Sequence, residues 1–198
     1  GTWNKREAGR MLEKLATRQS EAMDVGLTSP LESLGATHST TSMLSEAMQF
    51  CAQKIQVDNL DAVADLLRRN DRAACEYCLY GIAKGVATFL GTMDEQVKAV
   101  YVLDYDATPE DLCFGTLNQG TPLVHLIVWT ERKTAALSSL VAALDRALAQ
   151  AYTDLVGGPH VEVLLDAQMI DDADIENRAG YGALLQAIHH RPIQIWER

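Results

Sequence analysis

The sequence predicts a mixed α/β or α+β fold, in which N-terminal helices precede a β-β-α-β-α-β domain with a mixed sheet. Three features predict this fold. An apolar strand at residues 123–129 is followed by a long amphipathic helix and another strand at 161–165. Further strands are predicted at 97–105, rich in valine and tyrosine, and at 193–197. The chain before residue 93 carries apolar residues at helical spacing instead.

The strand–helix–strand unit between residues 123 and 166 is the centre of this prediction. Residues 123–129 are apolar on both faces, which is typical of a central strand covered on both sides. Either Thr130 or Thr134 can cap the helix that follows, and Gly157 and Gly158 end it. A unit of this length most simply forms a right-handed parallel crossover. The helix has one apolar stripe, made by Leu137, Leu140, Val141, Leu144, Leu148, Ala151 and Leu155.

Four helices are predicted ahead of the sheet. Residues 3–23 form the first, and a Ser/Thr/Gly-rich linker at 26–42 separates it from a second at 43–56. A third, capped at Asp58 or Asn59, runs through Leu67, and a fourth runs from an Asp71 cap to Gly91. In the fourth helix Gly81 and Gly85 lie one turn apart, which favours close approach of another element.

The remaining segments complete a division into three parts. A polar loop at 106–122 joins the first two strands, and an acidic segment at 171–176 precedes a short helix that ends at residue 188. We therefore expect an N-terminal helix and linker at 1–42, a helical segment at 43–92 and an α/β domain at 93–198.

Composition excludes several classes of function. The net charge of −10 argues against a general nucleic-acid binder or a binder of anionic membranes, since both need a basic surface. There is no apolar run near the roughly 20 residues that span a bilayer, and no signal-peptide pattern. The four cysteines, Cys51, Cys75, Cys78 and Cys113, are interpreted as reduced thiols. These features predict a cytoplasmic protein.

Residues 73–198 resemble the minimal nucleotidyltransferase fold. Residues 100–103 look like its first strand, 126–128 like the apolar end of its second, and 161–163 like its third. Members of that family carry Gly-Ser after the first strand, Asp-x-Asp on the second and a third carboxylate on the third. The three carboxylates hold two magnesium ions, and the Gly-Ser backbone cradles phosphate.

This chain departs from the family pattern at most of the chemical positions. Asp104-Tyr105 stands where Gly-Ser is expected, and Leu123-Val124-His125 stands where Asp-x-Asp is expected. Glu162 would represent the third carboxylate. A second register, which pairs Gly91-Thr92 with Asp104-Tyr105-Asp106, places the acidic pair at the wrong end of a strand. The resemblance therefore implies the fold without its transfer chemistry.

Five residues are candidates for a site. Asp104 and Asp106 share one face if their strand continues that far, and with Glu162 they are candidate catalytic carboxylates of a divergent, magnesium-dependent acidic site. His125 and Asp166 are candidate binding residues. The structural alternative is that strand ends collect aspartate because it favours turns, and that His125 is a hydrogen-bonded core residue.

Other motifs point away from familiar enzymes. Cys75 and Cys78 lie within a helical stripe with no second Cys-x-x-Cys, so no metal site is predicted from them. Gly-x-Gly-x-x-Gly, Walker-type and Gly-x-Ser-x-Gly motifs do not occur. The sequence thus predicts a catalytically degenerate binding or regulatory module that acts with a protein partner or as a homo-oligomer. A metal-dependent enzyme and a purely structural oligomerisation protein are the alternatives, and only the enzyme would need Mg²⁺.

Overall fold

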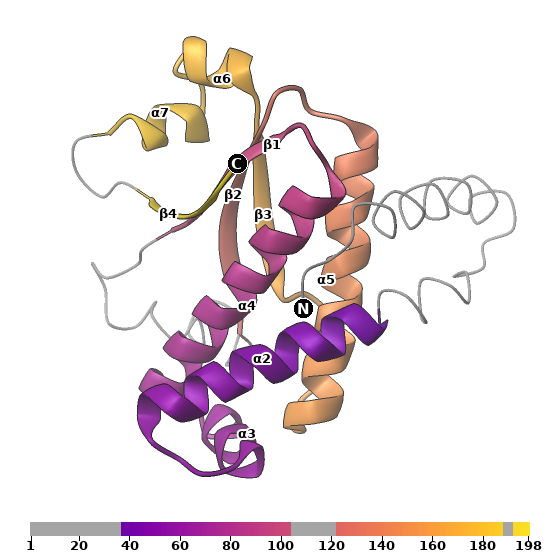
Figure 1. Cartoon of the computed structure of the whole chain (residues 1–198), viewed down its shortest axis with the longest axis vertical. Helices are drawn as coiled ribbons and strands as arrows, with labels where there is room; N and C mark the ends of the chain where they lie inside the picture. The colour runs from indigo at the N-terminus through magenta and orange to yellow at the C-terminus, as the bar shows by residue number, and fades with distance from the viewer. Residues whose placement is uncertain (1–36, 104–121, 188–191) are drawn as a thin grey trace, which may run out of the picture.

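A computed structural model describes residues 37–103, 122–187 and 192–198 of the chain (Figure 1). The predicted helix at 3–23, most of the predicted linker after it and residues 104–121 lie outside these residues. In chain order, the elements of the described part are α2 Thr37–Ile55, α3 Leu60–Arg68, α4 Arg72–Met93, β1 Val97–Val102, β2 Val124–Thr130, α5 Ala135–Val156, β3 Leu165–Ile170, α6 Asp172–Glu176, α7 Tyr181–Leu185 and β4 Ile193–Glu197.

The strands form a mixed sheet, as the sequence predicts. Their order is β3-β2-β1-β4 among the described residues. β1 is antiparallel to both β2 and β4, whereas β2 and β3 are parallel and joined by α5. Six of the seven residues of β2 are buried, because this strand has neighbours on both sides and side chains covered on both faces.

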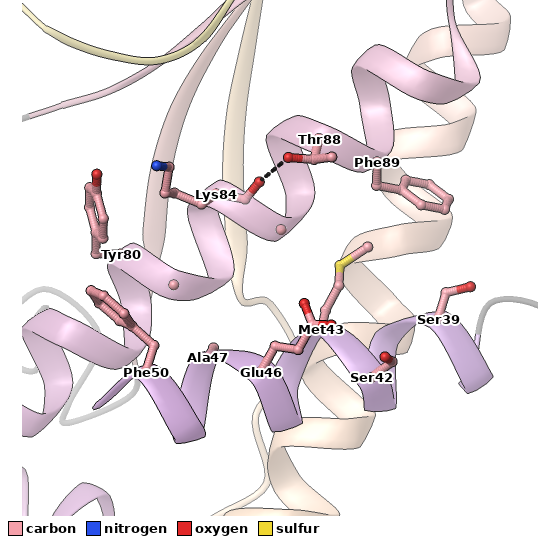
Figure 2. A pocket seen from close by; sticks show the side chains of 12 residues that line it. Ser39, Ser42, Met43, Glu46, Ala47, Phe50, Tyr80, Lys84, Thr88 and Phe89 are labelled. Atoms are coloured by element: carbon pink, nitrogen blue, oxygen red, sulfur yellow. Dashed lines mark hydrogen bonds between the residues drawn. The ribbon is translucent and has the colours of Figure 1, made fainter. Parts of the chain in front are cut away.

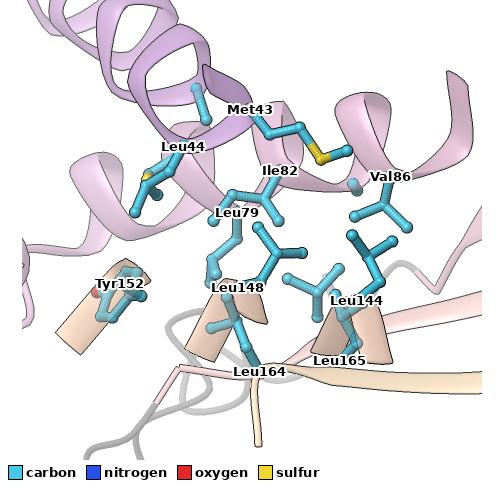
Figure 3. Close-up of a cluster of buried hydrophobic side chains, with 14 of the residues drawn as sticks. Met43, Leu44, Leu79, Ile82, Val86, Leu144, Leu148, Tyr152, Leu164 and Leu165 are labelled. Atoms are coloured by element: carbon cyan, nitrogen blue, oxygen red, sulfur yellow. The ribbon is translucent and has the colours of Figure 1, made fainter. Parts of the chain in front are cut away.

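Three helices are layered on one face of the sheet. α4 packs on β1, β2 and β4, while α5 packs on β3, and α2 lies across both helices on the side away from the sheet (Figure 1). α3 contacts α2, α4 and α5. Side chains from α2, α4 and α5 meet the start of β3 in a continuous apolar cluster, in which Leu44, Ile82 and Leu148 are fully buried (Figure 3).

Four of the predicted helix ends are confirmed. Asn59 accepts a hydrogen bond from the amide of Ala62, and Asp71 accepts one from Ala74. Thr134, one of two candidates, is the residue that caps α5. Gly157 follows α5 with a φ of 77°, a conformation in which glycine is not strained.

The predicted third strand is wrong in its position. β3 begins at Leu165 and continues to Ile170, so residues 161–164 precede it. Side chains of α5 bond the backbone of this segment. Thr153 accepts from the amide of Val161 at 3.1 Å, and Asp145 accepts from the amide of Leu164 at 2.7 Å. These amides are therefore not available to a sheet ladder.

Two predicted helix boundaries need correction, and the acidic segment is itself helical. α2 begins at Thr37, so the last residues of the predicted linker are helical. α4 continues past Gly91 to Met93. The glycine makes room for the Trp196 ring, which packs on the helix there: a Cβ at this position would lie 2.1 Å from Trp196 Cζ2. The acidic segment forms the short helix α6, with a capping box between Asp171 and Asp174.

Candidate functional site

The candidate site lies on the second face of the sheet, defined here as the face that α4 and α5 do not cover. Side chains alternate along a strand, and Val124, Leu126 and Val128 of β2 belong to the core under the helices. The intervening residues of β2 therefore face the other way, and so do two polar residues of β3. This second face comprises His125, Ile127, Trp129, Asp166 and Gln168.

His125 and Asp166 meet on this second face. The parallel register of β2 and β3 pairs these two residues directly, and His125 Nδ1 lies 2.8 Å from Asp166 Oδ2. A carboxylate only accepts hydrogen bonds, so Nδ1 carries the proton and donates it. The amide of Gln168 donates to the other oxygen of Asp166 at 2.9 Å. Two donors from adjacent positions thus fix the orientation of the carboxylate.

The two partners differ in their access to solvent. The His125 side chain is 10% exposed and that of Asp166 is 38% exposed. A carboxylate that holds one ring nitrogen fixes the tautomer of the imidazole and directs its basic nitrogen away from the carboxylate. The pair can therefore orient a histidine as a base or as a ligand, with its negative charge at the surface.

A second polar cluster lies at the end of β2 where α6 begins. Asp172 accepts hydrogen bonds from Lys98 at 2.8 Å and from the Trp129 indole at 2.9 Å, and Lys98 also lies over the Trp129 ring. The hydrogen bonds from Lys98 and Trp129 lower the pKa of Asp172 below its ordinary value. Since every group here has a partner within the cluster, its evident role is to hold α6 on the sheet.

A neighbouring ion pair acts in the same way. Lys133, in the turn before α5, lies 2.7 Å from Asp174 of α6. The hydrogen bond from Lys133 lowers the pKa of Asp174, and Asp174 in turn raises the pKa of the lysine. Asp172 and Asp174 of α6 are thus tied to groups on either end of the β2–α5 connection.

The predicted site residues fall into three groups. Asp104 and Asp106 lie outside the described residues. Glu162 is exposed in the segment before β3, four positions from Asp166, and does not lie on a strand. His125 and Asp166 are brought together. Sequence reasoning missed Gln168, although its place two residues after Asp166 on a strand puts both on one face.

Metal ligands do not gather in the part of the chain that the structure describes. Within that part, no group of three or more histidine, cysteine or acidic side chains is arranged to hold a metal ion. The thiols of Cys51, Cys75 and Cys78 are buried. Burial raises the pKa of Cys51 to about 11, which makes a thiolate ligand there unfavourable.

The described residues also contain a groove that is remote from the second face. It has a volume of about 440 Å³ and lies between α2 and α4, on the far side of α4 from the sheet (Figure 2). His125 and Asp166 do not line it.

Comparisons with known proteins do not identify the chain. No protein-family model matches it, and neither a curated protein nor a solved structure is similar to it. Across the described ranges, no helix has both the length and the apolar character of a membrane span. An inference about function therefore rests on the residues and their geometry.

Proposed function

We propose that this chain is a nucleotidyltransferase-like module that has lost the two-metal transfer chemistry and acts by binding a protein partner. The order of elements supports this proposal. A helix, a strand, a second strand, a crossover helix, a third strand, short helices and a closing strand follow one another from α4 to β4. The resemblance in the sequence implies the same order.

The pairing of His125 with Asp166 is the observation that carries the proposal. In the resemblance, His125 stands at the second aspartate of Asp-x-Asp, and a carboxylate on the third strand is expected beside it. Asp166 of β3 is directly paired with His125, so it fits that position better than Glu162 does. Here the carboxylate accepts a hydrogen bond from an imidazole and does not share a cation with a second carboxylate.

The loss of charge explains why transfer chemistry would fail at this position. Leu123 and His125 replace two carboxylates of the pattern, which leaves Asp166 as the negative group there. Two magnesium ions need several hard oxygen ligands to offset their charge and to orient a triphosphate. One carboxylate with an imidazole partner supplies too little negative charge for such a pair of ions.

The test combines a transfer assay with a thermal-shift screen. The full chain is incubated with each nucleoside triphosphate, with and without Mg²⁺ or Mn²⁺, and both product formation and the melting temperature are followed. We expect no nucleotide transfer and no metal-dependent rise in melting temperature, because a ligand raises Tm only if it binds the native state.

The opposite result would support the alternative of a metal-dependent enzyme with a divergent acidic site. In that case Asp166→Asn would abolish the metal-dependent shift, whereas Asp154→Asn, on the exposed side of α5, would retain it. Light scattering on the same samples gives the oligomeric mass, which tests the expected homo-oligomer separately from the chemistry.

A further inference from the structure

The groove between α2 and α4 is built on a close crossing of the two helices. They run antiparallel, and a Cβ added at Gly81 would lie 2.9 Å from Ala47 Cα, while one at Gly85 would lie 3.3 Å from Met43 Cγ. The two backbones therefore approach closely at a floor of small residues. The larger side chains on either side stand above this floor and form the walls (Figure 2).

The walls of the groove combine apolar and polar side chains, with two aromatic rings at one end. Phe50 of α2 and Tyr80 of α4 lie with ring centres 6.0 Å apart, and Phe89 marks the other end. Tyr80 keeps 37% of its surface exposed although it contacts another ring. The lining on α2 runs from Ser39 to Phe50, which is about 17 Å, or three helical turns.

Two lysines give the aromatic end of the groove a local positive charge. Nζ of Lys54 lies 5.6 Å from the centre of the Phe50 ring, and Nζ of Lys84 lies 5.8 Å from that of Tyr80. Neither lysine forms an ion pair with a residue of the described ranges, whereas Lys98 and Lys133 both do. One carboxylate, that of Glu46 on the α2 wall, lines the groove.

We propose that this groove binds an amphipathic helix of a partner protein, with acidic residues of that helix placed against Lys54 and Lys84. The groove is open to solvent at Tyr80, so a small ligand would leave much of its own surface exposed, whereas a helix covers an open groove with its own body. The lining on α2 is three helical turns long, which is long enough to contact apolar residues at positions i, i+4 and i+7 of a bound helix. Lys54 and Lys84, which form no ion pair within the described ranges, supply the positive charge that selects an acidic helix, in a protein whose net charge is −10.

This inference rests on the proposed binding of a protein partner, but it uses only α2 and α4 and none of the second face, so the nucleotide assay and the peptide assay can fail separately. The probe is a fluorescein-labelled amphipathic peptide of about 14 residues, near four helical turns, with leucines on one face and two glutamates in its first turn. A matched peptide carries two lysines in place of the glutamates. Binding of each to the full chain is measured by fluorescence anisotropy at low and high salt.

We expect saturable binding of the acidic peptide, weaker binding of the basic one, and a loss of the difference at high salt because screening acts on exposed charges. The double variant Lys54→Glu/Lys84→Glu should lower the affinity for the acidic peptide about tenfold and improve that for the basic peptide. Arg72→Glu, the same change of charge at the start of α4, should leave both affinities unchanged.

A second pair of variants tests the apolar contact. Tyr80→Ala should weaken the acidic peptide about tenfold, because exposed aromatic residues at the edge of a groove often carry much of the binding energy. Tyr181→Ala, at a tyrosine that is 38% exposed in α7, is the matched control and should have no effect. Melting curves confirm that each variant is folded.

Several results would overturn the proposal. These are the absence of saturable binding, equal binding of the acidic and basic peptides, or an equal effect of Arg72→Glu and of the double lysine variant. One further result would also contradict the proposal: neither peptide binds, the wild type is an oligomer, and the double lysine variant is a monomer. The groove would then hold a second copy of the chain and not an acidic helix.

Discussion

The two sides of the sheet are built from different chemistry. On one side, α2, α4 and α5 form an apolar layer in which the described thiols are buried, and burial raises the pKa values of Cys51, Cys78 and Tyr152. On the second face, each polar group that we describe has a charged or hydrogen-bonding partner. The helical layer thus contributes apolar burial, while the second face holds charged and hydrogen-bonded groups.

The largest effect is expected where the helical layer is fully buried. Ile82→Ala removes a side chain of α4 that has no exposed surface and leaves a cavity between the helices. The free energy of unfolding should fall by about 2 to 5 kcal/mol, which urea denaturation measures. A loss of less than about 1 kcal/mol would mean that α2 and α5 move to fill the cavity, and thus that the helical layer is not tightly packed around Ile82.

The close crossing of α2 and α4 should respond differently at its two glycines. Gly81→Ala places a Cβ against the backbone of Ala47, which cannot move without shifting α2, and should cost about 1 to 3 kcal/mol. Gly85→Ala meets the flexible side chain of Met43 instead, so strain and the gain in helix propensity should nearly cancel. If the two variants lower the melting temperature equally, Gly81 is not a closer contact between the helices than Gly85.

On the second face, the pairing of His125 with Asp166 should be worth less than the packing of the helical layer. Asp166→Ala leaves the Nδ1 hydrogen of a largely buried histidine without its acceptor and should lower stability by about 1 to 3 kcal/mol. Asp166→Asn keeps an oxygen acceptor and should cost less. Glu162→Ala, at an exposed residue before β3, is the control, and an equal loss in both alanine variants would show that the pair contributes nothing.

Local signals in the sequence predicted the helical part of the fold well, because caps and apolar stripes act within a few residues. Asn59, Asp71 and Thr134 cap helices through hydrogen bonds to amides three positions away. Thus α3 and α5 begin as predicted. The closing strand, Ile193–Glu197, was also predicted with its observed bounds.

The features that sequence reasoning missed depend on contacts between distant segments. Residues 161–165 have a strand-like pattern, but Thr153 and Asp145 of α5 accept hydrogen bonds from backbone amides of this segment. The strand therefore begins only at Leu165. Gly91 resembles a helix end, but Trp196, far along the chain, packs there within the helix. For the site, His125 and Asp166 were both named from the sequence, yet their pairing depends on the parallel register of β2 and β3, which no local pattern fixes.

The smallest effect is expected at Asp172, whose side chain is 48% exposed and whose ion pair with Lys98 is therefore screened by solvent. Asp172→Asn should lower the free energy of unfolding by less than about 1 kcal/mol at neutral pH. The pKa of Asp172 is lower in the folded protein than its ordinary value of 3.8, so the carboxylate stabilises the fold above that pH. This contribution is lost as the pH falls through the folded pKa.

Urea denaturation at a series of acidic pH values should therefore show the free energies of unfolding of the wild type and of Asp172→Asn converging. Glu162→Gln, the same change of charge at an exposed residue, should keep a constant difference from the wild type. A difference between wild type and Asp172→Asn that persists below the folded pKa would assign the effect to packing of α6 and not to the charge of Asp172.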